Sequence, residues 1–243
     1  DGGSVTLSAA DGNMDMQQIS IFGKPVWSEQ TLIVNSREIP AKQNGWQLLH
    51  TNASLPITLS SSMPWQISFI NIERPGRGVT VSAMGINGAQ LSQWSKWRPG
   101  MWEDLAQTKA DLIILAYGTN EAFSGNLDIS STERTWRNYI RQIKNTLPNA
   151  GILILGAPES LKTAYGSCGN RPVLLSEVQQ MQQRIARDEK IMFWSWQDAM
   201  GGACSMKNWM AQGLAAKDGV HFSAQGYETA ADKLADSLIR FAQ

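Results

Sequence analysis

The sequence predicts a two-part protein, with a β-rich N-terminal module in residues 1–78 followed by an α/β domain in residues 79–243. Three observations lead to this prediction. Short β-rich runs separated by Gly, Pro, Asn and Ser fill the first third of the chain. Continuous apolar runs appear only later, and helical patterns alternate with them. Such alternation favours a parallel sheet with helices layered against it.

The N-terminal module is expected to be a small antiparallel sandwich. Residues 18–22, 31–34 and 64–70 are β-rich runs, and no helical period between them survives more than a turn. Strands at this spacing with polar turns are typical of sandwiches. The turn-rich stretch 74–78 marks the boundary with the second part.

Four segments of the second part are expected to form strands: residues 78–83, 110–116, 151–156 and 190–194. The middle two are continuous apolar runs, which are typical of parallel strands buried on both faces. In such sheets functional residues gather in loops beyond the carboxyl ends of strands. Three loops therefore hold the candidates for chemistry: 85–89, 117–121 and 218–221.

Three helices are expected in the same part. Ser130 and Glu133 have the spacing of a capping box, and Pro148 stops the helix they open, whose apolar stripe is Trp136, Ile140, Ile143 and Leu147. A second helix follows Pro172, with the stripe Leu174, Val178, Met181 and Ile185. Ser223 is the expected N-cap of the last helix, whose stripe is Tyr227, Ala231, Leu234, Leu238 and Phe241.

Composition excludes several classes of function. Lys plus Arg (21) balances Asp plus Glu (21), so no net field attracts nucleic acid, and no apolar run approaches the ~20 residues of a membrane span. The chain has two histidines, His50 and His221, and two cysteines, Cys168 and Cys204. A structural zinc site needs about four such ligands and a catalytic one about three, so this inventory could barely supply one site, and its members lie far apart in sequence.

The two cysteines lie in Gly-rich loops, where a disulfide is sterically easy and would imply an oxidising compartment. The alternative is two unpaired thiols. The chain begins at Asp1 with neither Met nor a signal-peptide pattern, so we expect a processed form or a fragment.

An acid–histidine pair is the first candidate for catalysis. Asp218 precedes His221 by three residues on a loop, where a carboxylate can orient one ring nitrogen and leave the other as a base. The alternative is a surface histidine beside a loop-capping aspartate. His50 lies in the β-rich part, where a structural or surface role is expected.

Two further residues can stabilise negative charge on a reacting oxygen. The side-chain amide of Asn120 and the backbone N–H of Gly88 both follow expected strands, and both can donate to an oxyanion. Turn chemistry is the alternative, because Gly and Asn are favoured wherever a loop needs positive φ.

In this order and placement, Gly85-Ile86-Asn87-Gly88-Ala89, Gly118-Thr119-Asn120 and Asp218-Gly219-Val220-His221 resemble the SGNH (GDSL-type) esterase family. The resemblance spans about residues 79–243. It is closest to the branch with an inserted β-rich, carbohydrate-binding-like module, which includes peptidoglycan O-acetylesterases of bacterial periplasms.

The resemblance implies a three-layer, flavodoxin-like hydrolase domain joined to an inserted all-β sandwich module. It assigns the oxyanion hole to Gly88 and Asn120, with Gly85 as the alternative glycine. His221 becomes the general base and Asp218 its orienting partner. Acyl transfer by these groups needs no cofactor and no metal.

The family's nucleophile is a serine in a Gly-Asp-Ser motif after the first strand, and this chain contains no such motif. The nearest match, Gly2-Gly3-Ser4, lacks a preceding buried strand. We therefore expect the serine, with the first strand and helix, on a segment upstream of Asp1. A non-catalytic relative is the alternative.

The resemblance thus implies a periplasmic or secreted serine esterase that removes O-acetyl or other short acyl groups from a cell-envelope polysaccharide such as peptidoglycan. An acyltransferase with the same triad and an inert carbohydrate-binding relative are the alternatives. Trp94, Trp97 and Trp102 follow the Gly88 loop and can either stack on sugars or pack between helix and sheet.

Overall fold

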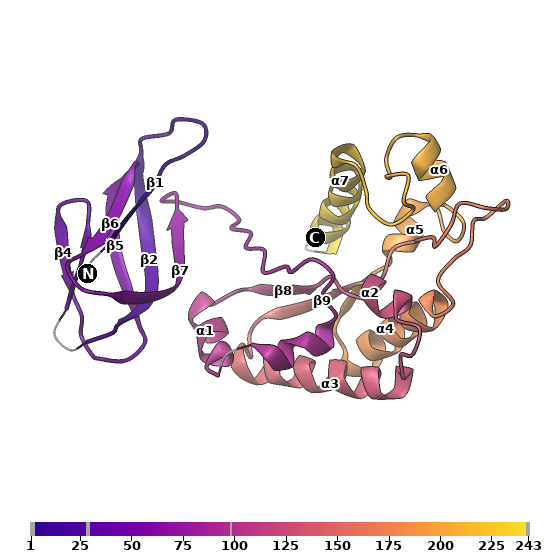
Figure 1. Cartoon of the computed structure of the whole chain (residues 1–243), viewed down its shortest axis with the longest axis horizontal. Coiled ribbons are helices and arrows are strands. Elements are labelled where there is room, and N and C mark those ends of the chain that lie inside the picture. The colour runs from indigo at the N-terminus through magenta and orange to yellow at the C-terminus, as the bar shows by residue number, and fades with distance from the viewer. Residues whose placement is uncertain (1–2, 28–29, 98, 242–243) are drawn as a thin grey trace. The chain divides into compact units, whose positions relative to one another are not determined.

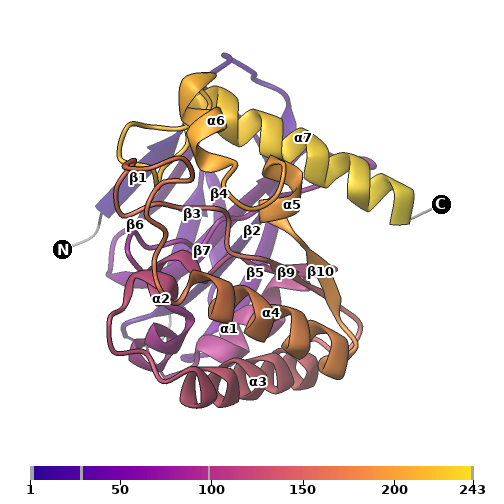
Figure 2. The same cartoon turned by 90° about the vertical axis from the view of Figure 1, so that its right-hand side faces the viewer.

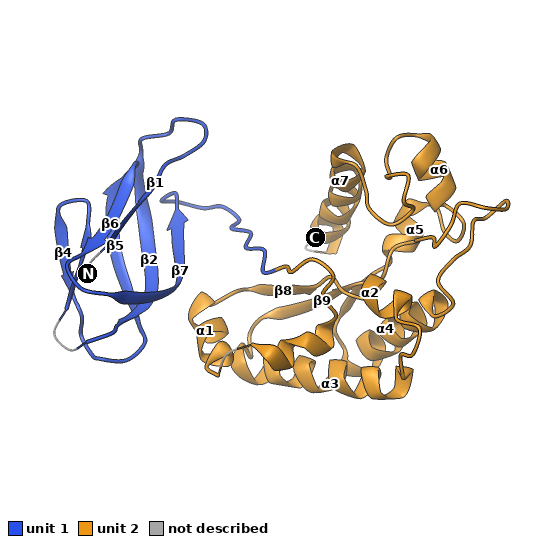
Figure 3. Cartoon of the chain, in the orientation of Figure 1, with its two compact units in different colours: residues 1–84 blue, residues 85–243 orange. Residues whose placement is uncertain are grey.

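The structure is a computed structural model that describes residues 3–27, 30–97 and 99–241 (Figure 1). The chain divides into two compact units, residues 1–84 and residues 85–243 (Figure 3). Within the described ranges, no helix is both long enough and apolar enough to span a membrane.

The first unit consists of two antiparallel sheets. One has the strand order β1 (Gly3–Leu7), β6 (Ile57–Ser61), β3 (Thr31–Val34), β4 (Arg37–Pro40). The other has the order β5 (Gln47–Ser54), β2 (Met16–Pro25), β7 (Trp65–Glu73). The strands expected at 18–22, 31–34 and 64–70 are present, whereas β1, β4, β5 and β6 were not anticipated from the sequence.

Both sheets contribute to one apolar core. Buried and exposed residues alternate along β5, as expected for a strand with one face on a core. The buried side chains form a single cluster: Ile19, Ile21, Leu32, Val34, Leu49, Ala53, Ile57 and Leu59. The unit is therefore a small sandwich with its own core.

The second unit is built on a parallel sheet of three strands in the order β10 (Met192–Trp194), β9 (Gly151–Leu155), β8 (Leu112–Leu115). These are three of the four strands expected from the apolar runs. Its long helices are α1 (Met101–Thr108), α3 (Ile129–Thr146), α4 (Leu175–Glu189) and α7 (Ala224–Phe241), and its short ones are η1 (Leu91–Lys96), α2 (Thr119–Phe123), α5 (Trp196–Met200) and α6 (Met206–Ala211).

Helices lie on both sides of this sheet. The apolar stripes of α3 and α4 pack with β9 in one buried cluster that includes Trp136, Ile140, Met181 and Ile154. In both views α7 lies on the opposite side of the sheet from α3 (Figures 1 and 2). The strand–helix alternation thus produces the layered α/β unit that the sequence predicts.

The strand expected at residues 78–83 does not form. This segment has no regular secondary structure, and Val79 and Val81 are 93% and 85% exposed. A strand needs a neighbour to satisfy its backbone groups, and no described strand pairs with this segment. The prediction of a strand at residues 78–83 was therefore wrong.

Two further predictions, the N-cap of α3 and the burial of the apolar stripe of α7, were wrong. Asp128 rather than Ser130 caps α3, because its carboxylate accepts hydrogen bonds from the backbone N–H groups of Ser130 and Ser131. Ser223 does cap α7 through a bond from Gly226 N. The expected stripe of α7 is largely uncovered, however, with Tyr227 47% and Phe241 76% exposed.

Candidate active site

Asp218 and His221 form a directly bonded pair on the turn before α7. The distance from Asp218 Oδ2 to His221 Nδ1 is 2.8 Å. The other carboxylate oxygen accepts the backbone N–H groups of Val220 (2.8 Å) and His221 (3.0 Å). Because one carboxylate holds both the turn and the imidazole, the ring has a fixed orientation.

The same contacts control the charge of the aspartate. The hydrogen bond from His221, followed by the backbone hydrogen bonds, lowers the pKa of Asp218 from 3.8 to about 2. The carboxylate is therefore ionised at neutral pH and can accept a hydrogen bond from the N–H of His221 Nδ1. The side chains of His221 and Asp218 are 72% and 50% exposed, so Nε2 is accessible to a reacting group.

Asn120 lies in the first turn of α2 and contacts the Gly88 loop. Its side-chain amide donates to the carbonyl of Ala89 (2.9 Å), while Gln90 Nε2 donates to the carbonyl of Asn120 (3.2 Å). Gly88 has a φ of 76°, and no atom lies within 4 Å of where a Cβ would stand. The two predicted oxyanion donors therefore belong to adjoining segments, with an open space beside Gly88.

Glu121 holds the Gly88 loop and the start of α2 in place, and the sequence did not predict this role. Its side chain is 1% exposed and accepts the backbone N–H groups of Leu91 (3.0 Å) and Gly118 (2.9 Å). Burial raises the pKa of this carboxyl, and the hydrogen bonds oppose that shift. The signal was present in Gly-Thr-Asn-Glu, since a glutamate three residues after a helix start can accept backbone donors there.

Gln182 of α4 holds the ends of β8 and β9 together. Its Nε2 donates to the carbonyl of Tyr117 (2.7 Å), and its Oε1 accepts the N–H of Ala157 (2.9 Å). At Gly118 a Cβ would lie 2.7 Å from Gln182 Nε2, so only glycine fits beside this amide. A polar helix residue thus fixes the loop that carries Asn120, and no local pattern could have indicated it.

The other candidates lie elsewhere or have packing roles. Ser4 lies in β1 and His50 bonds Ser20 across β2 and β5, so both belong to the first unit. Trp94 donates to Tyr117 Oη and stacks on Trp97, which places it in a packed aromatic cluster.

Within residues 3–27, 30–97 and 99–241, no hydrogen bond links Asn120 to the Asp218–His221 pair, and none reaches His221 Nε2. In the same ranges no group of three or more His, Cys, Asp and Glu is arranged to hold a metal ion.

Solved structures resemble this chain to different degrees. A peptidoglycan O-acetylesterase is 63% identical, with a TM-score of 0.93 over 98% of this chain and 68% of that one. An acetyl xylan esterase is 16% identical, with a TM-score of 0.50 over 63% of this chain and 78% of that one. A Bacillus subtilis protein is 12% identical, with a TM-score of 0.52 over 100% of this chain and 81% of that one. The last two likenesses concern the fold alone.

A search of curated protein sequences gave no match. The model of the GDSL-like lipase/acylhydrolase family, in contrast, matches residues 67–229, which include Gly88, Asn120, Asp218 and His221. With most of the chain matched and a 63% identical relative over nearly its whole length, the protein belongs to the GDSL-like lipase/acylhydrolase family.

Proposed function

We propose that this protein is a serine esterase that removes O-acetyl groups from peptidoglycan. The observation that carries the proposal is the Asp218–His221 pair, bonded at 2.8 Å with Nε2 exposed. The substrate comes from the peptidoglycan O-acetylesterase, which is 63% identical over 98% of this chain.

In this reaction His221 Nε2 takes the proton of a serine hydroxyl while that oxygen attacks the acetyl carbonyl. Asp218 holds the proton on Nδ1 by a hydrogen bond and stabilises the imidazolium that forms. His221 then protonates the leaving sugar oxygen, and the acetyl group stays on the serine. A water molecule, deprotonated by the same nitrogen, releases acetate and restores the serine.

Gly88 and Asn120 are proposed to receive the negative charge of the tetrahedral intermediate. No atom lies within 4 Å of where a Cβ on Gly88 would stand, and the Asn120 amide lies on the adjoining helix start. The Asn120 amide carries two N–H groups, so one can stay bonded to the carbonyl of Ala89 while the other donates to the substrate oxygen. Donors placed in advance stabilise such charge because they need little reorganisation.

The serine is proposed to come from polypeptide outside residues 1–243. It would lie on a strand beside β8, which among the described strands pairs only with β9. Ile114 of β8 is 43% exposed, although apolar residues of a parallel sheet are normally covered. An additional strand and helix would cover this side chain and satisfy the free edge of β8.

We also propose that residues 1–78 are a module inserted in the hydrolase domain, which residues 79–243 complete. The family match begins at residue 67, within β7, so most of the first unit lies outside the matched residues. The protein is proposed to work in the periplasm or outside the cell, where its substrate lies and where the Cys168–Cys204 disulfide persists.

Acetate release from O-acetylated peptidoglycan by the complete protein tests this function. His221→Ala is expected to lower kcat by at least about a thousandfold, because the general base is lost. His50→Ala, the only other histidine change available, serves as the matched control and should retain full activity. Acetyl transfer to a second glycan without free acetate would overturn the hydrolase assignment, and activity that survives in His221→Ala would overturn the mechanism.

A further inference from the structure

We infer that the loop of residues 159–171, which the Cys168–Cys204 disulfide ties to residues 201–205, is a positioning element that holds the Asp218–His221 turn through Leu161. The inference rests on the proposed function for its catalytic meaning. The contacts themselves join three segments of the second unit: this loop, residues 201–205 and residues 215–222.

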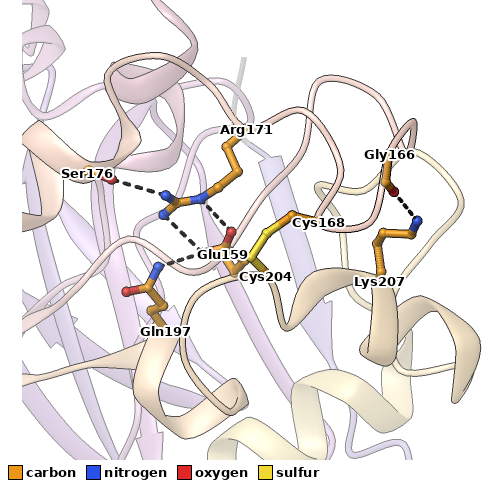
Figure 4. The surroundings of a disulfide bond; sticks show 8 residues. All are labelled: Glu159, Gly166, Cys168, Arg171, Ser176, Gln197, Cys204 and Lys207. Carbon is orange, nitrogen blue, oxygen red and sulfur yellow. Dashed lines mark hydrogen bonds and ion pairs between the residues drawn. A yellow bond between two sulfur atoms is a disulfide. The ribbon is translucent and has the colours of Figure 1, made fainter.

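A buried ion pair closes the base of the loop (Figure 4). Glu159 is fully buried, and its Oε1 lies 2.6 Å from Arg171 Nε. Gln197 Nε2 donates to the other carboxylate oxygen, and Arg171 also donates to Ser176 Oγ (3.1 Å). A buried carboxylate is tolerated only when its partners satisfy it, so these contacts define where the loop leaves and rejoins the fold.

The disulfide fixes the returning arm of the loop. Cys168 is bonded to Cys204, with the two Cα atoms 4.8 Å apart. Backbone bonds from Lys162 N to Asn170 O (2.7 Å) and from Asn170 N to Thr163 O (2.8 Å) draw its two arms together. The tip is exposed, with Tyr165 90% accessible. The part of the loop that contacts the Asp218 turn is therefore its base, where Leu161 bonds Gly219.

Leu161 connects this frame to the catalytic turn. Its N–H donates to the carbonyl of Gly219 (2.8 Å), and its side chain is 1% exposed. A Cβ on Gly169 would lie 2.6 Å from a Leu161 methyl group, and one on Gly219 would lie 3.0 Å from Leu161 Cβ. Leu161 therefore fills the space between the glycine after Cys168 and the glycine after Asp218.

Gly219 is the residue through which this packing reaches the imidazole. It follows Asp218 directly, has a φ of 71°, and donates to Ala216 O (3.1 Å). Asp218 Oδ1 accepts the backbone N–H groups of Val220 and His221, which follow Gly219. A shift of Gly219 therefore moves the Asp218 carboxylate relative to His221. Displacements of about 1 Å in a catalytic group can lower a rate by roughly one-hundredfold.

Steady-state kinetics of the complete protein test the inference. Leu161→Ala, and the double change Cys168→Ser with Cys204→Ser, are expected to lower kcat roughly ten- to one-hundredfold while KM changes less than about twofold. Lys207→Gln is the matched control, because it removes a bond to Gly166 O at the loop tip and leaves the Leu161 contacts intact. If the folded double variant keeps kcat within about twofold, the inference is overturned.

A nitrogen-detected NMR measurement of the imidazole separates positioning from general loss of structure. With only His50 and His221 in the chain, His50→Gln assigns the spectrum. The unaltered protein should carry its neutral-form proton on His221 Nδ1, and the disulfide variant should show mixed tautomers. An unchanged tautomer with unchanged kcat would contradict the inference. This readout needs no turnover, so it tests the positioning role even if the esterase proposal fails. If Leu161→Ala does not fold, Leu161→Val replaces it in the kinetic measurement.

Discussion

Two carboxylates of the second unit show how residue environment sets chemical role. Asp218 is half exposed and bonded to His221, so its pKa falls to about 2 and it remains an anion beside the imidazole. Glu121 is buried, which raises its pKa, and it serves as an acceptor for two loop N–H groups. Asp218 orients the proposed general base, and Glu121 shapes the segment that carries the proposed oxyanion donors.

Asn120 is predicted to act on the rate of the chemical step. In Asn120→Ala, kcat should fall about one-hundred- to one-thousandfold with KM nearly unchanged, because one donor to the oxyanion is lost. The matched control is Gln90→Ala, which removes the other hydrogen bond between the same two segments. Equal losses of kcat in both variants would assign Asn120 to loop anchoring.

The lowered pKa of Asp218 predicts a pH dependence of stability. The carboxyl has a pKa of about 2 when folded and about 3.9 when unfolded, so its contribution is present above pH 4 and disappears as the pH falls toward 2. Because the side chain is half exposed, we expect only about 1 kcal/mol.

Urea unfolding of Asp218→Asn, measured at pH 6 and pH 2, checks this prediction. The free energy of unfolding should differ from that of the unaltered protein at pH 6 and converge with it at pH 2. Asp232→Asn, an exposed carboxylate change on α7, should follow the unaltered protein at both pH values. A constant difference for Asp218→Asn would remove the charge pair as the cause.

At the scale of elements, the sequence predicts best where periodicity and burial agree. Trp136, Ile140 and Ile143 were predicted on one stripe of α3, and each is fully buried. The strand at 78–83 failed although its apolar pattern was clear, because a strand depends on a neighbour that its own residues cannot specify. Asp128 was missed as the cap of α3, since both Asp128 and Ser130 are good N-cap residues.

The stripe of α3 provides a test of the second unit's core. Ile140→Ala should lower the free energy of unfolding by about 3 kcal/mol, since the side chain is fully buried between helix and sheet. Arg141→Ala, on the exposed side of the same helix turn, should change it by less than about 0.5 kcal/mol. Chemical denaturation measures both, and similar values for the two variants would contradict the assigned core.

At the scale of the whole molecule, the order of the motifs along the chain indicated the family more specifically than any one motif. No single one of Gly88, Asn120 and Asp218-x-x-His221 was specific, but their order after successive strands indicated the family that the comparisons establish. The structure brings Asp218 to His221 and Asn120 to the Gly88 loop. Gln182 could not be found this way, because its role depends on tertiary contacts.

The nucleophile and the edge of the parallel sheet belong together at this scale. Among the described residues, no serine is hydrogen-bonded to His221, β8 pairs only with β9, and Ile114 is 43% exposed. These features follow if a strand that carries the serine comes from polypeptide outside residues 1–243. The uncovered stripe of α7, with Phe241 76% exposed, fits the same explanation.

The most direct measurement is covalent labelling of the complete protein with a fluorophosphonate, followed by peptide mass spectrometry. Such reagents modify a serine whose hydroxyl an adjacent base activates. We predict one labelled serine, outside residues 1–243, with labelling abolished in His221→Ala and unchanged in His50→Ala. A labelled serine within residues 1–243, or labelling that persists in His221→Ala, would contradict the account.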